Sequence, residues 1–233
     1  MRFSVTSDLH LEFYTTSAMH KIANALNSLD VDIHLIAGDI SPKKSVRENL
    51  KNLLVKDSMM VMGNHDYYHG KIDVEPPIEF LNVDGVNIVG TTLWTSFNNN
   101  DPMVKLRYKE YMSDYKLIDP PDEDDRDLTD IIYQHHIQVT EEIFSSNPDI
   151  VVTHHCPVLQ CIDPKYSHMT IENFFYASNL FERIVDSNIK YWICGHTHHR
   201  KIFDVGNTKI VLNPRGYPNE VKQLYTPLVF ELE

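Results

Sequence analysis

Short runs of apolar and β-branched residues recur along the chain, and each run ends abruptly at a polar residue. Runs this short and this continuous are typical of strands that are buried on both faces of a sheet. They predict strands over residues 3–7, 33–37, 59–62, 149–153 and 190–194.

Longer segments between these runs carry the hydrophobic spacing of helices. Leu180, Ile184 and Val185, for example, recur at the helical period of about 3.6 residues. The pattern predicts helices over residues 18–29, 42–55, 128–145 and 172–187. Because strands and helices alternate, we expect an α/β fold with largely parallel strands and right-handed crossovers.

The C-terminal third has a different pattern, in which strands follow one another with short turns between them. We expect strands over 201–205, 208–212 and 227–232. Gly206-Asn207 is typical of a hairpin turn between the first two of these strands. Strands joined by a hairpin are antiparallel, so the sheets are expected to be mixed.

Two segments between the predicted elements are candidates for substrate recognition, namely 95–127 and 156–170. Within the first, residues 114–127 are acidic and interrupted by proline. We interpret 114–127 as a solvated connecting loop, with a flap that gates the substrate as the alternative.

Composition places the chain among ordinary globular proteins. With 233 residues, of which 42% are hydrophobic and 23% charged, a single domain over 1–233 is the simplest expectation. The 33 acidic residues outnumber the 21 basic ones and give a net charge of -12. This charge argues against a protein that gains its affinity from neutralising a phosphate backbone, since such proteins are usually basic.

The chain carries no apolar stretch of the length that crosses a bilayer and no secretory signal pattern, so we expect no membrane partner. Its three cysteines are an odd number without CxxC spacing, which favours reduced thiols over a disulfide framework. We therefore expect a cytoplasmic location. The sequence leads to no expectation about the oligomeric state.

The polar residues at the predicted strand ends are of the types that bind metal ions. Ligand sites in open α/β sheets collect at the carboxyl ends of strands. Imidazoles and carboxylates together suit Zn, Mn, Fe and similar ions, and this set exceeds what one ion needs. The number of these side chains suits two ions that share one bridging carboxylate. The residues are Asp8, His10, Asp39, Asn64, His65, His154, His196 and His198.

Each of these signals is weak when it stands alone. An isolated Asp-x-His is more often a turn than a ligand pair, and Gly-Asn-His-Asp is also typical of an Asx-turn. The pair His154-His155 is equally compatible with core or surface histidines. Five such coincidences at successive strand ends, however, make the structural interpretation improbable.

Five short blocks in a fixed order resemble those of a known family. SDLH, GDI, GNHD, THHCP and GHTH, spread over nearly the whole chain, are similar to the signature of the calcineurin-like metallophosphoesterases. The resemblance implies a four-layer α/β/β/α sandwich with two mixed central sheets. The segments SDLHLEF and NPRGY are similar to small, stand-alone bacterial or phage members.

The resemblance also implies roles for individual residues, with Asp39 bridging two divalent ions. One ion would be bound by Asp8, His10 and His198. The other would be bound by Asn64, His154 and His196, with His155 as the alternative to His154. Mn, Fe, Zn and Ni share such ligands, and Mn is favoured here.

Metal chemistry of this kind implies hydrolysis without a covalent intermediate. Two divalent ions hold a bridging water and lower its pKa enough to supply hydroxide near neutral pH. His65 would protonate the leaving oxygen. Asp66 would either orient His65 or pin its loop, and Arg215 would either grip phosphate or form a structural salt bridge.

The expected function is hydrolysis of a small or nucleotide-like phosphodiester. The alternatives are a nuclease that acts on nucleic acid and a non-catalytic scaffold with the same fold. A complete ligand set together with His65 argues against the scaffold. The GDISPKK block lacks the second Asp and the Arg of the protein serine/threonine phosphatases, so a phosphoprotein phosphatase is a poor interpretation.

Overall fold

The computed structural model describes residues 1–122, 124–220 and 225–232. Two central sheets carry most of the strands. The first has the order β12-β1-β2-β3 and is built from β1 (Arg2–Thr6), β2 (Ile33–Ala37), β3 (Asp57–Val61) and β12 (Leu228–Glu231). The second has the order β10-β11-β9-β8-β6-β5 and is built from β5 (Ile78–Val83), β6 (Val86–Thr91), β8 (Ile150–Thr153), β9 (Tyr191–Cys194), β10 (Lys201–Val205) and β11 (Thr208–Leu212).

Both sheets are mixed, as the sequence predicts. In the first sheet β1, β2 and β3 are parallel and β12 runs antiparallel to β1. In the second sheet β6, β8, β9 and β11 are parallel, whereas β5 and β10 run antiparallel to their neighbours. A short third pairing joins β4 (Gly70–Lys71) to β7 (Ile118–Asp119).

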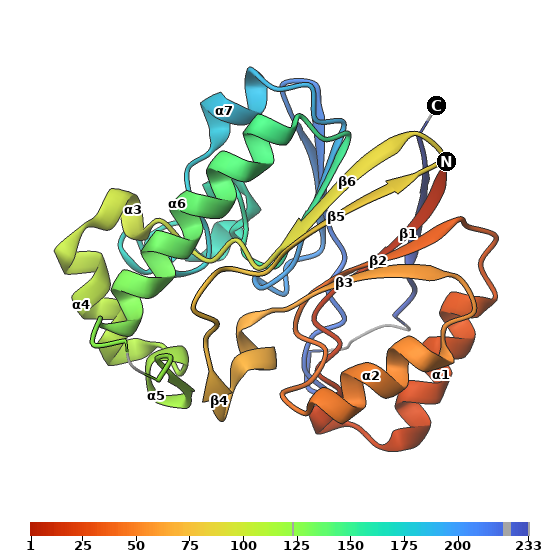
Figure 1. Cartoon of the computed structure of the whole chain (residues 1–233), viewed down its shortest axis with the longest axis horizontal. Coiled ribbons are helices and arrows are strands. Elements are labelled where there is room, and N and C mark those ends of the chain that lie inside the picture. The colour runs from red at the N-terminus through yellow and green to blue at the C-terminus, as the bar shows by residue number, and fades with distance from the viewer. Residues whose placement is uncertain (123, 221–224, 233) are drawn as a thin grey trace.

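Helices cover the outer face of each sheet. Figure 1 shows α1 and α2 against the four-stranded sheet, and α6 and α7 against the six-stranded sheet. The α/β/β/α sandwich that the resemblance implies is therefore confirmed. The helices are α1 (Thr16–Asn27), α2 (Lys44–Leu53), α3 (Phe97–Asn100), α4 (Pro102–Tyr111), α5 (Asp114–Leu117), α6 (Leu128–Ser146) and α7 (Phe181–Val185).

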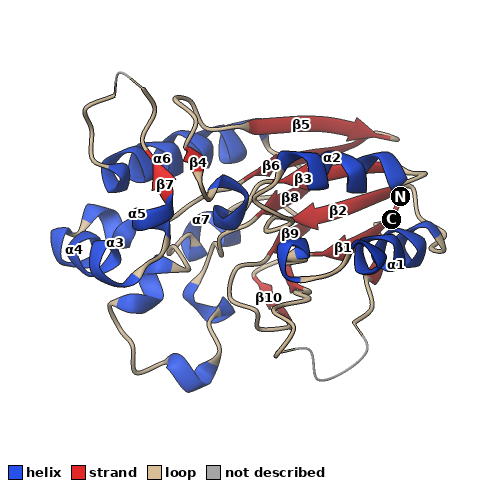
Figure 2. Ribbon diagram, turned by 90° about the horizontal axis from the view of Figure 1, so that it is seen from below, coloured by secondary structure: helices blue, strands red, loops and turns tan. Residues whose placement is uncertain are grey.

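The main core lies between the two sheets. Leu35 of β2 belongs to the same buried cluster as Val152 of β8 and Ile193 of β9. Both faces of the central parallel strands are covered, which explains why their sequences read as continuous apolar runs. The short helices α3, α4 and α5 lie beyond the carboxyl ends of these strands, as Figure 2 shows. That end of the sandwich therefore has an additional helical layer.

The helix predicted over 172–187 is wrong. The structure has a 3-10 turn at Glu172–Phe175, then an irregular stretch, and then the short α7. The irregular stretch forms an isolated bridge with the loop after β8, where Cys156 N–H donates to Tyr176 O at 3.1 Å and Ser178 N–H donates to Cys156 O at 3.0 Å. A backbone engaged in this bridge cannot continue a helix.

The sequence analysis also misplaced or missed several elements. Segment 114–127 is not wholly a loop, because it contains α5 and β7. Helix α4 was not predicted, and neither was the β5–β6 hairpin. The signal for this hairpin is Asp84-Gly85, whose φ angles of 50° and 84° are those of a type I′ turn.

Candidate metal centre

Polar residues from five strand ends meet between the carboxyl edges of the two sheets. Strands β1, β2 and β3 belong to one sheet, and β8 and β9 to the other. The two sheet edges therefore face a common site. In chain order, the predicted ligands gathered there are Asp8, His10, Asp39, Asn64, His154, His196 and His198.

One group of donor atoms surrounds the ring nitrogen of His10. Its Nε2 lies 3.0 Å from Nε2 of His198 and 3.7 Å from Oδ2 of Asp39. Nε2 of His198 in turn lies 3.4 Å from Oδ1 of Asp8. Two ligand atoms that are each about 2.1 Å from one ion lie about 3.0–3.4 Å apart. The 3.0 Å and 3.4 Å separations suit a shared cation, and the 3.7 Å separation to Asp39 is slightly longer.

A second group of donor atoms surrounds the ring nitrogen of His154. Its Nε2 lies 3.0 Å from Oδ1 of Asn64, 3.2 Å from Nδ1 of His196 and 3.4 Å from Oδ1 of Asp39. The two carboxylate oxygens of Asp39 thus face different groups, Oδ2 toward His10 and Oδ1 toward His154.

Three of the histidines have their other ring nitrogen on an acceptor. Nδ1 of His10 lies 3.3 Å from Glu12 Oε1, and Nδ1 of His198 lies 2.6 Å from Glu220 Oε2. Nδ1 of His154 is 2.9 Å from the carbonyl of the last residue of β2. A carboxylate or carbonyl behind the imidazole is what orients metal-binding histidines, because it fixes the ring and leaves Nε2 free to coordinate.

The donor set fits divalent metal ions. Nε2 of His196 is buried without a hydrogen-bond partner among the described residues. The Nε2 atoms of His10 and His198, only 3.0 Å apart, both point into the centre. A cation between these two nitrogens would interact favourably with the lone pair of each. Buried imidazoles and carboxylates are ligands that Mn, Fe and Zn accept.

The protonation equilibria show how strongly this site attracts positive charge. Burial alone would raise the pKa of Asp39, but the imidazoles of His154, His65 and His10 hold it well below its usual value. Burial disfavours protonation of both His154 and His198. Asp39 and Asp8 nevertheless raise the pKa of His154 to about 9, and Asp8 and Glu220 raise the pKa of His198 to about 9. The buried carboxylates therefore favour cations in their immediate surroundings.

The backbone at the centre is unusual. Asp8, His10, Asp39, His196 and His198 have φ angles of 52°, 45°, 53°, 70° and 49°. L-residues rarely adopt this left-handed region, and such conformations cluster at functional sites. The sharp turns direct side chains from the strand ends into the space between the sheets.

Glycines that precede ligands make room for other ligands. A Cβ atom on Gly195 would lie 2.5 Å from Oδ2 of Asp8, and a Cβ on Gly63 would collide with Oδ1 of Asp39. These contacts are shorter than van der Waals separation. Steric crowding therefore explains why glycine directly precedes the ligand in the GNHD and GHTH blocks.

His154, rather than His155, is directed into the donor group. His155 is fully buried beside Trp94, with ring centroids 5.0 Å apart. Burial and the neighbouring His154 hold the pKa of His155 well below its usual value. The structure therefore packs His155 behind the centre.

Comparison with known proteins identifies the family. The family described as calcineurin-like phosphoesterase matches residues 1–200. The chain belongs to this family. It is a metal-dependent phosphoesterase, that is, a phosphoric ester hydrolase.

The phosphoesterase has relatives in a virus and in bacteria. It is 26% identical over 260 residues to an uncharacterised protein of Acanthamoeba polyphaga mimivirus, covering 92% of this chain and 90% of the relative. It is 32% identical over 97 residues to an uncharacterised metallophosphoesterase of Helicobacter pylori, and this match covers 39% of this chain and 25% of the relative. Among solved structures, a phosphopantetheinyl hydrolase of Mycobacterium tuberculosis shares the fold, with a TM-score of 0.70 and 15% identity. The match covers 99% of this chain and 96% of the hydrolase.

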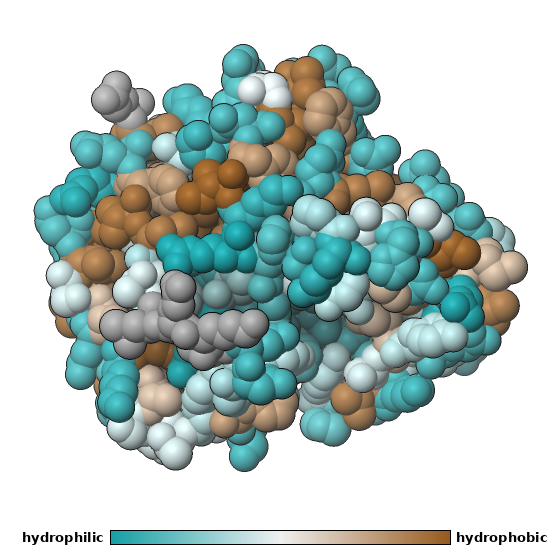
Figure 3. All heavy atoms as spheres, turned by 180° about the vertical axis from the view of Figure 1, so that it is seen from behind, coloured by the Kyte–Doolittle hydropathy of each residue, from teal (hydrophilic) through white to brown (hydrophobic). Residues whose placement is uncertain are grey.

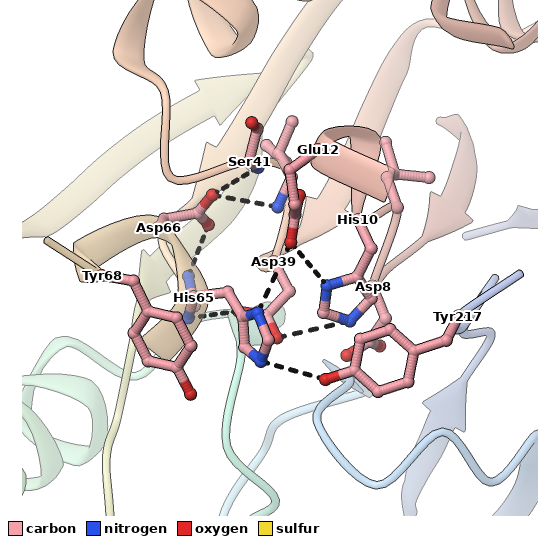
Figure 4. Close-up of polar contacts among 12 residues, drawn as sticks. Asp8, His10, Glu12, Asp39, Ser41, His65, Asp66, Tyr68 and Tyr217 are labelled. Atoms are coloured by element: carbon pink, nitrogen blue, oxygen red, sulfur yellow. Dashed lines mark hydrogen bonds and ion pairs between the residues drawn. The ribbon is translucent and has the colours of Figure 1, made fainter. Parts of the chain in front are cut away.

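His65 of the phosphoesterase lies beside the metal centre and between two polar side chains. Figure 4 shows it between Glu12 and Tyr217. Its Nδ1 is 3.5 Å from Glu12 Oε1, and its Nε2 is 3.1 Å from the Tyr217 hydroxyl. Burial would lower the pKa of His65, but the carboxylates of Glu12, Asp39 and Asp114 raise it.

Asp66 pins the loop and has no described contact with the ring of His65. Its Oδ1 accepts N–H hydrogen bonds from Ile40 at 3.0 Å and Ser41 at 2.8 Å, and its Oδ2 accepts one from Gly63 at 2.8 Å. Asp66 therefore points away from the ring and ties the loop after β3 to the loop after β2 (Figure 4).

The structure does not bring the guanidinium of Arg215 to the cavity. It donates to the Leu9 carbonyl at 3.1 Å and lies 3.5 Å above the ring centroid of Tyr14. No carboxylate pairs with Arg215 in the part of the chain that the structure describes. The backbone of the same segment donates to Ser7 O and Asp8 O, which places Tyr217 over the centre.

A cavity of about 590 Å³ opens over the centre. Asp39, Asn64, His65, His196 and His198 lie at its floor. Most of its wall comes from segments 111–113 and 162–176, within or beside the two segments expected to recognise substrate. Figure 3 shows one face of the molecule, with hydrophilic residues around a hollow near its middle. The aromatic residues of the walls are Tyr68, Tyr111, Tyr166, Phe175, Tyr176 and Tyr217.

Sequence reasoning missed three residues that support the site. Glu12 and Glu220 hold the ring nitrogens of His10 and His198, and the Tyr217 hydroxyl contacts His65. Glu12 and Tyr217 belong to the SDLHLEF and NPRGY segments, which were noticed but given no such roles. For Glu220 the sequence offers no signal.

No helix in the described ranges is long and apolar enough to cross a membrane.

Proposed function

We propose that the protein hydrolyses a small phosphodiester with two divalent ions, which Asp39 bridges. The observation that carries this proposal is the position of Asp39, whose two oxygens face two separate groups of donor atoms. The first group contains Asp8, His10 and His198. The second contains Asn64, His154 and His196.

The ions, when bound, acidify water for attack and neutralise charge on the phosphoryl oxygens. The residues of the chain hold this chemistry in place. Glu12 and Glu220 keep Nε2 of His10 and His198 directed at the centre. His65 lines the cavity and is not needed as a ligand, so it can donate a proton to the oxygen that leaves the phosphorus.

The cavity supports a small substrate. A volume of about 590 Å³ lies within the range of small-molecule sites, and several tyrosines offer flat apolar surfaces for the organic part of an ester. A nucleotide-like diester fits this description. The structural similarity to a phosphopantetheinyl hydrolase adds diesters with a pantetheine arm to the candidates.

We further propose that Mn²⁺ is the native metal, with Fe, Zn and Ni as alternatives that share the ligands. A cytoplasmic location accords with the three cysteines, which are free and buried.

A substrate panel with defined metals tests the proposed function. Metal-stripped protein is supplied with each ion in turn and assayed on nitrophenyl mono- and diesters, nucleotide diesters, cyclic nucleotides and a pantetheine-bearing diester. We expect a diester to be hydrolysed fastest, with Mn²⁺. Exclusive hydrolysis of monoesters would overturn the diester assignment. Preference for single- or double-stranded DNA, with a steep dependence on salt, would favour the nuclease.

A further inference from the structure

Asp114, the first residue of α5, is a fully buried carboxylate with three side-chain hydrogen-bond donors. Its Oδ1 accepts from the Asn64 amide nitrogen at 2.8 Å and from the Tyr68 hydroxyl at 2.7 Å. Its Oδ2 accepts from the Tyr108 hydroxyl at 2.6 Å. An unpaired buried carboxylate is costly, so such complete pairing makes the position of Asp114 well defined.

The hydrogen bond from Asn64 decides which end of its amide faces the metal centre. The Asn64 nitrogen donates to Asp114 and, at 3.2 Å, to the Tyr68 hydroxyl, while its oxygen lies 3.0 Å from Nε2 of His154. With the amide reversed, its oxygen would face the Asp114 carboxylate without a proton between them. Two hydrogen-bond acceptors that face each other in a buried site, with no donor between them, are unfavourable.

The two tyrosines act as donors in this network. A carboxylate accepts hydrogen bonds and cannot donate them, so the protons come from the hydroxyls of Tyr68 and Tyr108, at 2.7 Å and 2.6 Å. Both hydroxyls therefore keep their protons and donate to Asp114. The carboxylate has no need of a cation of its own.

We infer that Asp114 is a positioning residue, which holds the amide oxygen of Asn64 toward the metal centre and joins the centre to the wall of the substrate cavity. The inference rests on the proposed role of Asn64 as a ligand. Residues 111–113, directly before Asp114, line the cavity. A single carboxylate thus connects the segment that contacts the substrate with a metal ligand from the loop after β3.

Calorimetric titration of the metal-stripped full chain with Mn²⁺ tests this inference without a substrate. Residues behind a metal ligand typically contribute about 10–100-fold to metal affinity. We expect Asp114→Ala to lose about this much at one of the two ions and to leave the other close to normal. Asp114→Asn keeps an oxygen that accepts from Asn64, so its affinity should stay within about threefold of the original.

Asp127→Asn is the matched control. Asp127 also accepts several hydrogen bonds, from Lys109 at 2.8 Å, Tyr115 at 2.8 Å and Thr129 N–H at 3.0 Å, but it contacts no proposed metal ligand. We expect Asp127→Asn to lower the melting temperature and to leave Mn²⁺ binding unchanged. If Asp114→Ala behaves in the same way, Asp114 only stabilises the helical layer and the inference is wrong.

Two further variants keep the outcomes separate. If Asp114→Ala does not fold, Asp114→Leu decides, because leucine is close to aspartate in shape and cannot accept the hydrogen bond from Asn64. Unchanged Mn²⁺ binding by Asp114→Leu would then overturn the inference. Asn64→Ala tests the proposed function instead. If Asn64→Ala binds both ions with full affinity, Asn64 is not a ligand and the proposed ligand set is wrong. If Asn64→Ala loses Mn²⁺ affinity but Asp114→Ala does not, only the role of Asp114 is contradicted.

Discussion

The hydroxyl of Tyr217 lies 3.1 Å from Nε2 of His65, a contact between residues 152 positions apart in the sequence. On the other side of the ring, Nδ1 of His65 faces Glu12 at 3.5 Å. The imidazole is therefore held from both ends beside the metal centre. These two contacts fix the orientation of the ring beside the cavity.

Removing the Tyr217 hydroxyl is expected to affect His65 and not the metals. Tyr217→Phe loses one hydrogen bond, typically about 1 kcal/mol, and we expect kcat to fall about fivefold on an ester with an alkoxide leaving group. Steady-state kinetics and metal analysis on one preparation check this. Loss of bound metal in Tyr217→Phe would show that the residue supports the ligands instead.

The importance of His65 should depend on the leaving group. A nitrophenolate leaves as an anion without help, whereas an alkoxide needs a proton. General-acid catalysis contributes about 10²–10⁴-fold, so His65→Ala should lose kcat in that range on a nucleotide ester and clearly less on a nitrophenyl ester. Equal losses on the two esters, measured where chemistry limits both rates, would rule out the acid assignment.

If Asp39 bridges two ions, as proposed, its loss should cost more activity than the loss of Asp8. We expect Asp39→Asn to weaken both ions, because its oxygens face both donor groups, and Asp8→Asn to weaken mainly one. Metal content after dialysis and turnover should fall together, and further in Asp39→Asn. Retention of two ions with near-normal turnover in that variant would disprove the bridging role.

His136 of α6 should make stability depend on pH. Burial lowers the pKa of its imidazole to about 4, below the ordinary value of about 6.5. The unfolded chain then binds an extra proton between these values, so stability is complete above about pH 6.5 and falls as pH drops toward 4. At pH 5 the loss from this residue is about 2 kcal/mol.

Urea unfolding at pH 7.5 and pH 5 checks the role of His136. His136→Gln keeps a donor for the Leu93 carbonyl, which lies 3.2 Å from Nδ1 of His136. The drop in unfolding free energy between the two pH values should be about 2 kcal/mol smaller in this variant than in the original chain. His20→Gln, at an exposed histidine, should show the original drop. The same drop in all three proteins would contradict the prediction.

The sequence predicts the strands of the core and the residues at their ends because both signals are local. Strand β2 is apolar apart from His34, and Asp39 follows it directly after a glycine. The hairpin β5–β6 was missed although Asp84-Gly85 marks its turn, because β5 is half exposed and neither strand is a continuous apolar run. The 172–187 helix was wrong because a backbone bridge to Cys156 outweighs the local periodicity.

The residues that orient the centre could not be predicted in the same way. Glu220 reaches His198 from 22 residues away, and Asp114 reaches Asn64 from 50 residues away. Neither lies at the end of a core strand, and Asp114 comes from a segment that was interpreted as a loop. Such contacts depend on how distant segments pack, which local patterns do not encode.

Titration of activity with metal tests the central claim most directly. Metal-stripped protein at a concentration far above the dissociation constants is supplied with increasing Mn²⁺, and hydrolysis of a diester is followed at each ratio. The two-ion centre predicts that activity reaches its maximum at two equivalents of Mn²⁺ per chain. A maximum at one equivalent, or full activity without added metal in protein shown to contain none, would contradict it.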